Sequence, residues 1–265
     1  MACKKFSLHL FLAIPFFANA QKGIDGLINA EKSFAAYSVA QGTKHAFLKF
    51  ADSTAVVFEN GKAVNAIETW NKRENRPAIL NWRPQYAAIS KSGDLGFTMG
   101  PWTFQQTLHD TIVARGHYTT VWHLTNNGEW KFLADLGAGN SPVNGDTALV
   151  ILKAKGKIKS GSLSNMLAAE RNFIGLKDRK QAYDKFLSTT AVLNRNGKLP
   201  QYASWDAPSL PALTEYIVIG SGIASSGDFG YVYGTTVING KTDNYLRIWW
   251  QENGKWKIGA EVLRY

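Results

Sequence analysis

Residues 92–97 read Ser-Gly-Asp-Leu-Gly-Phe and residues 226–231 read Ser-Gly-Asp-Phe-Gly-Tyr, so one turn-and-strand signature occurs twice in the chain. Further segments pair up in the same order on both sides of this signature. They are 30–34 with 169–173, 47–48 with 186–187, 60–62 with 196–198, 118–122 with 245–249, and 127–131 with 253–257. Collinear repetition of this kind predicts two diverged copies of one domain.

Each copy places helical patterns before strand patterns, which is the order of an α+β domain. In the first copy, apolar residues recur at helical spacing between Ile24 and Ala35, and a second short helix is expected from about Thr43. Antiparallel strands separated by turn sequences should follow as far as Leu136, with another helix near 66–74. The second copy should repeat this order.

The repeats divide the chain into four parts. We assign residues 1–20 to a signal peptide, 21–139 to the first copy, 140–161 to a linker rich in Gly, Ser, Pro and Lys, and 162–265 to the diverged second copy.

The N-terminal segment has the layout of a cleavable secretory signal. Lys4 and Lys5 precede an apolar run at 8–17, and Ala18-Asn19-Ala20 offers a cleavage site. We therefore expect a periplasmic or secreted protein that begins near Gln21. The run is shorter than the roughly 20 residues that span a bilayer, so no transmembrane segment is expected.

Cysteine usage and charge narrow the possible chemistry. The only cysteine, Cys3, lies before the apolar run, so it cannot anchor a lipid and leaves with the signal peptide. Disulfides, thiolate metal sites and cysteine nucleophiles are thereby excluded from the mature protein. The formal net charge of +10 favours anionic surfaces or ligands without identifying one.

Several motifs of the first copy resemble one known family. They are Glu31-x-x-Phe34, Leu80-x-Trp82-x-Pro84, the Ser-Gly-Asp turn, Gly116-His117-Tyr118 leading to Trp122, and Gly128-Glu129-Trp130-Lys131 followed by Asp135. Together they resemble the nuclear transport factor 2-like superfamily, in particular its SnoaL-like, ketosteroid-isomerase-like branch. The second copy lacks the Trp-x-Pro element and has Glu261 in place of Asp135.

The resemblance implies two tandem cone-shaped domains. Each would be a strongly curved antiparallel sheet wrapped around N-terminal helices, with a cavity open at one end. Such domains commonly pair through their sheets, and both faces of strand 244–250 are apolar enough to be covered. We therefore predict that the two copies pack as an intramolecular pseudo-dimer.

Glu31 is the first candidate site residue because it falls on the apolar stripe of its helix, and Glu170 repeats this in the second copy. A buried acid needs partners. It could be a cavity carboxylate with a raised pKa that acts as general acid or base. Its recurrence in both copies suits the alternative of a structural acid satisfied by tyrosine, tryptophan or backbone donors.

Two further carboxylates are candidates. Asp135, repeated as Glu261, lies on the last strand and could line the cavity or pair with a nearby arginine. Glu59 lies near the position where the related ketosteroid isomerases hold their catalytic base. Strand 114–124 contains no carboxylate, whereas those isomerases place a second acid there, so an isomerase mechanism has little support.

Aromatic residues on successive strands are expected to form an apolar cavity wall with hydroxyl and indole donors. In the first copy they are Trp82, Tyr86, Trp102, Tyr118 and Trp122, and Tyr245 and Trp249 are second-copy equivalents. For each residue alone, core packing is the alternative.

Other site classes find no pattern in the sequence. His117 and His123 share a strand face but stand about 20 Å apart at strand rise, so they cannot hold one metal ion. No glycine loop precedes a helix in the manner of phosphate-binding motifs. We expect no metal, no cofactor and no nucleic-acid partner.

Three functional hypotheses remain open. The first is an exported protein that binds a small, largely apolar molecule in the first copy, oriented by Glu31, Tyr118 and Asp135. The second is a general acid-base enzyme, a hydrolase, dehydratase or isomerase, that uses Glu31 or Asp135. The third is a structural or assembly module that acts through its basic surface.

Overall fold

The structure is a computed structural model that describes residues 22–140, 148–202 and 214–265. The expected signal peptide and residues 141–147 of the expected linker lie outside these ranges. None of the helices in the described ranges combines the length and hydropathy needed to cross a membrane.

The first half begins with two helices, as the sequence predicts. They are α1 (Ile24–Gln41) and α2 (Thr43–Phe50), and α3 (Ala66–Lys72) follows the first hairpin. The strands are β1 (Ala51–Glu59), β2 (Lys62–Asn65), β3 (Ile79–Trp82), β4 (Tyr86–Ile89), β5 (Leu95–Gln105), β6 (Ala114–Leu124), β7 (Trp130–Gly139) and β8 (Val150–Ile151). Strand β8 pairs with β4, so part of the segment expected to be a linker belongs to the first sheet.

The second half repeats the order of helices and strands within its described residues. Its helices are α4 (Leu163–Gly175) and α5 (Arg179–Phe186). Its strands are β9 (Leu187–Arg195), β10 (Lys198–Tyr202), β11 (Thr214–Ile223), β12 (Phe229–Ile238), β13 (Lys241–Glu252) and β14 (Lys255–Leu263). A counterpart of α3 would fall among residues 203–213, outside the described ranges.

Both sheets are mixed, which corrects the expectation of purely antiparallel sheets. The strand orders are β2-β1-β7-β6-β5-β4-β8, with β3 also on β5, and β10-β9-β14-β13-β12-β11. Strand β1 runs parallel to β7, and β9 runs parallel to β14. The reason is the order of the elements along the chain. A hairpin forces two neighbouring strands to be antiparallel, but β1 and β9 each follow a helix and are not joined by a hairpin to β7 and β14.

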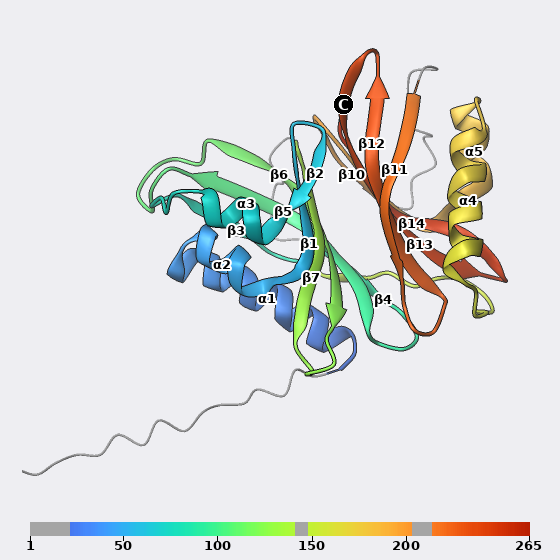
Figure 1. Ribbon diagram of the computed structural model, residues 1–265, viewed down its shortest axis with the longest axis horizontal. Coiled ribbons are helices and arrows are strands. Elements are labelled where there is room, and N and C mark those ends of the chain that lie inside the picture. The colour runs from blue at the N-terminus through green and yellow to red at the C-terminus, as the bar shows by residue number, and fades with distance from the viewer. Residues whose placement is uncertain (1–21, 141–147, 203–213) are drawn as a thin grey trace, which may run out of the picture.

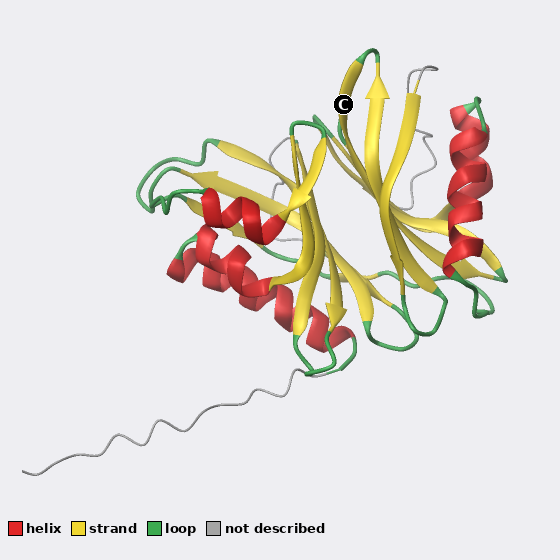
Figure 2. Cartoon of the chain, in the orientation of Figure 1, coloured by secondary structure: helices red, strands yellow, loops and turns green. Residues whose placement is uncertain are grey.

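The two sheets face each other, with the helices on the two outer sides (Figure 1). Figure 2 shows the resulting layers, helix, sheet, sheet and helix, by colour. The inner layer is apolar and contains Phe97 and Leu136 from the first half and Leu246, Ile248 and Val262 from the second. Separate aromatic cores lie between each sheet and its own helices. Each sheet therefore has two buried faces, as the sequence of strand 244–250 predicts.

The two Ser-Gly-Asp turns contact each other reciprocally. The Lys91 backbone N–H donates to the Asp228 carboxylate at 3.1 Å, and the equivalent Ser225 N–H donates to Asp94 at 3.1 Å. The hydroxyls of Ser92 and Ser226 lie 2.8 Å apart between them. Lys91 corresponds to Ser225 and Asp94 corresponds to Asp228, so each turn makes the same contact with the other turn. Equivalent contacts in both directions are the pattern of a two-fold symmetric interface.

Truncating a side chain in the inner layer should destabilise the fold. Ile248 is fully buried there, so Ile248→Ala should lower the free energy of unfolding by about 2–5 kcal/mol in urea denaturation. Ile217→Ala is the control, because Ile217 is 57% exposed on β11, and should cost less than about 1 kcal/mol. Equal losses in the two variants would show that the layer contributes little.

Candidate ligand-binding site

Glu31 lies at the centre of the first half, fully buried between α1 and the sheet. Three neutral donors from three strands satisfy its carboxylate: the indole N–H of Trp82, the hydroxyl of Thr98, and the indole N–H of Trp122 at 2.8 Å. This is the arrangement of the structural alternative in the sequence analysis. The carboxylate is enclosed rather than open to a cavity.

Burial raises the pKa of Glu31 to about 7, against the opposing effect of its hydrogen bonds from Thr98, Trp82 and Trp122. The Asp135 carboxylate adds a smaller upward contribution to this pKa. No cation takes part in these hydrogen bonds, so the cost of desolvating the charge is only partly offset.

Next to this centre is a cavity of about 260 Å³. Its lining residues are Phe47, Leu80, Trp82, Trp102, Tyr118, Asp135, Gly137 and, from the end of the chain, Arg264. The cavity thus has aromatic walls from three strands of the first half and one residue contributed by the second half. The Trp102 indole packs against Gly116 and Gly137, where a Cβ atom would come within 2.7 Å and 3.2 Å of it.

Asp135 and Tyr118 are two polar residues that the first half contributes to this cavity. The Thr120 hydroxyl donates to Oδ2 of Asp135 at 2.6 Å, and burial raises the pKa of Asp135 to about 6. The Tyr118 hydroxyl is buried without a well-formed hydrogen bond among the described residues, although Thr98 lies close enough to lower its pKa slightly, and burial raises this pKa well above the ordinary value. The cavity therefore offers a carboxylate that ionises near neutrality and a hydroxyl that stays protonated.

In the second half the equivalent acids are neutralised by arginines. Arg247 forms ion pairs with both Glu170 and Glu261, and Arg195 forms another with Glu261. The Trp249 indole and the Tyr245 hydroxyl also donate to Glu170, at 2.8 Å and 3.1 Å. Burial alone would raise the pKa of Glu261, but Arg195 and Arg247 hold it below its ordinary value.

Strand register shows which residues correspond. Arg247 pairs with Glu261 in the second sheet as Thr120 pairs with Asp135 in the first, so arginine replaces threonine at this position. The sequence contained a signal for this network, because Arg247 alternates with Tyr245 and Trp249 on one strand face. A cation among aromatic residues requires buried acids as partners.

Three predicted cavity residues lie elsewhere. Trp122 is fully buried and donates to Glu31 instead of lining the cavity. Glu59 is the last residue of β1, where it forms an ion pair with Arg73 and is partly exposed. Tyr86 belongs to the layer between the sheets, where its ring lies 5.7 Å from that of Tyr202.

The position of Tyr86 follows from the chain between β3 and β4. Trp82 and Tyr86 would share a face of one continuous strand. Their partners on β5, Trp102 and Met99, are three residues apart and therefore face opposite sides. The irregular segment 83–85 thus reverses the alternation.

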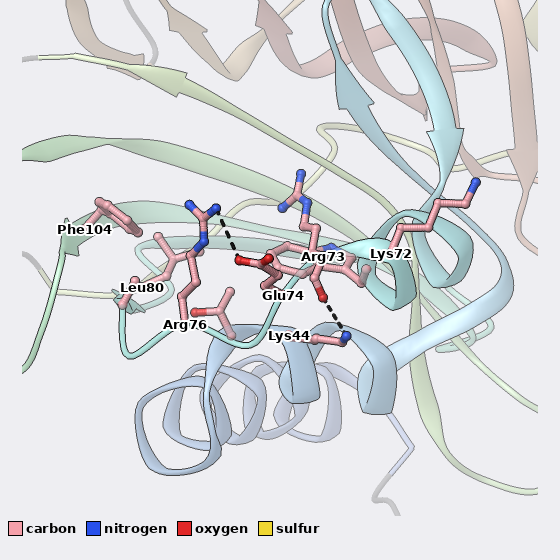
Figure 3. Close-up of a pocket in the computed structure, with 10 residues that line it drawn as sticks. Lys44, Lys72, Arg73, Glu74, Arg76, Leu80 and Phe104 are labelled. Carbon is pink, nitrogen blue, oxygen red and sulfur yellow. Dashed lines mark hydrogen bonds and ion pairs between the residues drawn. The ribbon is translucent and has the colours of Figure 1, made fainter.

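A larger hollow of about 620 Å³ lies between α2, α3 and β3, and Leu80 lines both hollows (Figure 3). Three of its four basic side chains have partners: Lys44 donates to the Asn71 and Arg73 carbonyls, and Arg76 lies 3.9 Å from Glu74. The Arg73 guanidinium lies 4.0 Å over the Trp70 ring. Most of the positive charge at this hollow is therefore engaged by local groups.

Removing Arg247 should strongly destabilise the second half. In Arg247→Ala, Glu170 loses its ion-pair partner and Glu261 retains only Arg195, so the free energy of unfolding should fall by about 3–5 kcal/mol. Arg171→Ala, at an exposed position on α4, is the matched control and should cost about 0.5 kcal/mol or less. Similar losses would mean that the buried ion pairs do not stabilise the fold.

Glu31 should make stability fall as pH rises. Between about pH 4.5 and 7 the folded chain retains a proton that the unfolded chain has released, so stability is lost through this interval. The loss should approach about 3 kcal/mol at pH 8. Urea denaturation at pH 5 and pH 8 measures it together with a smaller loss of the same sign from Asp135, whose pKa burial raises to about 6.

Glu31→Gln should remove the larger part of this pH dependence, because glutamine does not ionise, and should leave the smaller part that comes from Asp135. Glu129→Gln changes an exposed carboxylate and should keep the slope of the wild-type protein. A Glu31→Gln variant with the wild-type slope would contradict the raised pKa.

No family model and no curated protein matches the chain. Among solved structures, an NTF-2-like protein of unknown function from Shewanella oneidensis MR-1 is 18% identical, with a TM-score of 0.35, over 43% of this chain and 96% of its own. A putative ketosteroid isomerase from Shewanella frigidimarina NCIMB 400 is 17% identical, with a TM-score of 0.32, over 42% and 92%. A putative calcium/calmodulin dependent protein kinase II association domain from Xanthomonas campestris is 12% identical, with a TM-score of 0.34, over 44% and 88%. Each match spans about the length of one half, so the chain is similar to NTF-2-like and ketosteroid-isomerase-like structures over that length.

Proposed function

We propose that the protein is an exported small-molecule-binding protein whose ligand occupies the cavity of the first half. The observation that carries this proposal is the Asp135 carboxylate at an aromatic-walled hollow of about 260 Å³, with one oxygen held by Thr120. Tyr118 lines the same hollow. Concave apolar sites with a few convergent polar groups are typical of ligand pockets.

The difference between the halves supports assigning the ligand to the first half. In the second half the equivalent acids already have arginine partners, and Arg247 is fully buried. In the first half Asp135 has only a hydroxyl partner among the described residues. A buried carboxylate without a cation gains more from a ligand that supplies one or more donors.

We further propose that the two halves form an intramolecular pseudo-dimer of strongly curved sheets. The reciprocal contacts of the two Ser-Gly-Asp turns and the shared apolar layer support this proposal. In this arrangement Arg264 of the second half reaches the rim of the cavity of the first.

A general acid-base enzyme is the second candidate, and one observation favours it. Burial raises the pKa of Asp135 to about 6, close to the range in which a side chain exchanges protons efficiently at neutral pH. The Tyr118 hydroxyl beside it could hydrogen-bond a developing negative charge on a substrate oxygen.

A fragment library followed by thermal shift tests the binding proposal. A ligand that binds only the folded chain, at 100 times its Kd, adds about 2.7 kcal/mol of stability and raises the melting temperature. Asp135→Asn should reduce the rise, whereas Glu59→Gln, outside the cavity, should not. If no compound stabilises the wild-type protein, the proposal fails. NMR spectra of a bound compound before and after incubation separate the candidates, since an enzyme transforms it and a binding protein returns it unchanged.

A further inference from the structure

In the second half, aromatic rings and carboxylates surround the guanidinium of Arg247, whose Nη2 is buried without a hydrogen bond among the described residues. The centre of the guanidinium lies 4.3 Å from the ring centroid of Phe173, 4.3 Å from that of Tyr216 and 4.4 Å from that of Tyr245. The same group donates to Glu170 and Glu261. Aromatic faces and carboxylates around one guanidinium form an aromatic cage.

The first half has the counterparts of this cage without the arginine. Tyr216 pairs with Thr236 on β12 as Trp82 pairs with Trp102 on β5, so Trp82 corresponds to Tyr216. The remaining counterparts are Phe34 for Phe173, Tyr118 for Tyr245, Glu31 for Glu170, Asp135 for Glu261 and Thr120 for Arg247. The acids and rings are therefore retained, and the charge that they surround is missing.

Three counterparts of the cage residues, Trp82, Tyr118 and Asp135, line the cavity of about 260 Å³. Trp82 covers Glu31 in the first half, so the carboxylate that faces the cavity is Asp135. Trp82 and Tyr118 line the same cavity, and their rings lie 6.3 Å apart. Trp102 adds an indole that the second half lacks.

We propose that this cavity binds a small organic cation, a guanidinium or an ammonium group on a short apolar stem. The proposal rests on the binding function proposed above and names its ligand class. A bound cation would supply the positive charge that Arg247 supplies to the second half. Its stem would pack on the indoles of Trp82 and Trp102.

Arg264 is the lining residue that would repel such a ligand. Its Nε donates to the Asp243 carboxylate at 2.7 Å, and Nη2 lies 3.5 Å from Oδ1 of Asn244. The charge of Arg264 is thus balanced by an acid of its own half. Asp135 has no such arginine partner among the described residues, so its negative charge is available to a cation that enters the cavity.

Three probes of one shape but different charge test the ligand class. They are benzylammonium, benzyl alcohol and benzoate, and their affinities for the full-length mature protein are measured by calorimetry at pH 8, where Asp135 is ionised. Benzylammonium should bind about tenfold more tightly than benzyl alcohol, and benzoate should bind least. Ethylguanidinium should compete with benzylammonium.

Asp135→Asn identifies the carboxylate responsible. This variant should lose about tenfold in benzylammonium affinity and change little for benzyl alcohol, because the shape of the cavity is kept. Glu59→Gln removes a carboxylate outside the cavity and should change neither affinity.

The outcomes separate this inference from the broader proposal. If benzyl alcohol or benzoate binds as tightly as benzylammonium, a ligand site exists and the cation inference is wrong. If neither the fragment library nor any of the three probes binds, the binding function itself fails and the cation inference fails with it.

The second half provides an independent test. Arg247→Ala empties its cage, and ethylguanidinium at millimolar concentration should then raise the melting temperature of the variant towards that of the wild-type protein. Arg171→Ala should show no such rescue. If the Arg247→Ala variant folds and ethylguanidinium leaves its melting temperature unchanged, this set of residues does not recognise free cations. If the variant does not fold, the affinities of the three probes for the wild-type protein decide whether the inference holds.

Discussion

A carboxylate on the apolar face of the first helix of each half is the constraint on which this structure depends. Glu31 and Glu170 are completely enclosed, and an ionised acid in such a place is costly unless donors surround it. The strands provide these donors: the indoles of Trp122 and Trp249 reach the two acids from equivalent positions at 2.8 Å each. This contact fixes the register of the helix against the sheet in both halves.

The two halves complete the solvation of this acid differently, and their cavities differ as a result. In the first half neutral donors suffice, so the acid keeps a raised pKa and the neighbouring Asp135 faces an open space. In the second half a guanidinium joins both acids and fills the centre. The difference is one position on one strand, Thr120 or Arg247, together with the aromatic residue beside it. Together with Arg195, which also pairs with Glu261, these differences leave Asp135 without an arginine partner among the described residues and give one to each acid of the second half.

Much of the fold could be predicted from local patterns, whereas the site depended on packing. The repeats, the first helices and the burial of Glu31 follow from spacing in the sequence. Pairing of β1 with β7 is non-local, so no local pattern indicates its direction. The face occupied by Tyr86 depends on an irregular connection. That Asp135, and not Glu31, faces the cavity depends on where the indole of Trp82 packs, which residue spacing does not encode.

The reciprocal contact of the two Ser-Gly-Asp turns has an evolutionary consequence. In a symmetric homodimer any mutation appears in both subunits, so an arginine that closes one site also closes the other. Two copies joined in one chain are free of this coupling, because each copy mutates independently of the other. One copy can then acquire substitutions that only stabilise the fold, and the other copy can keep or change its cavity independently. Identical subunits of a homodimer cannot diverge in this way.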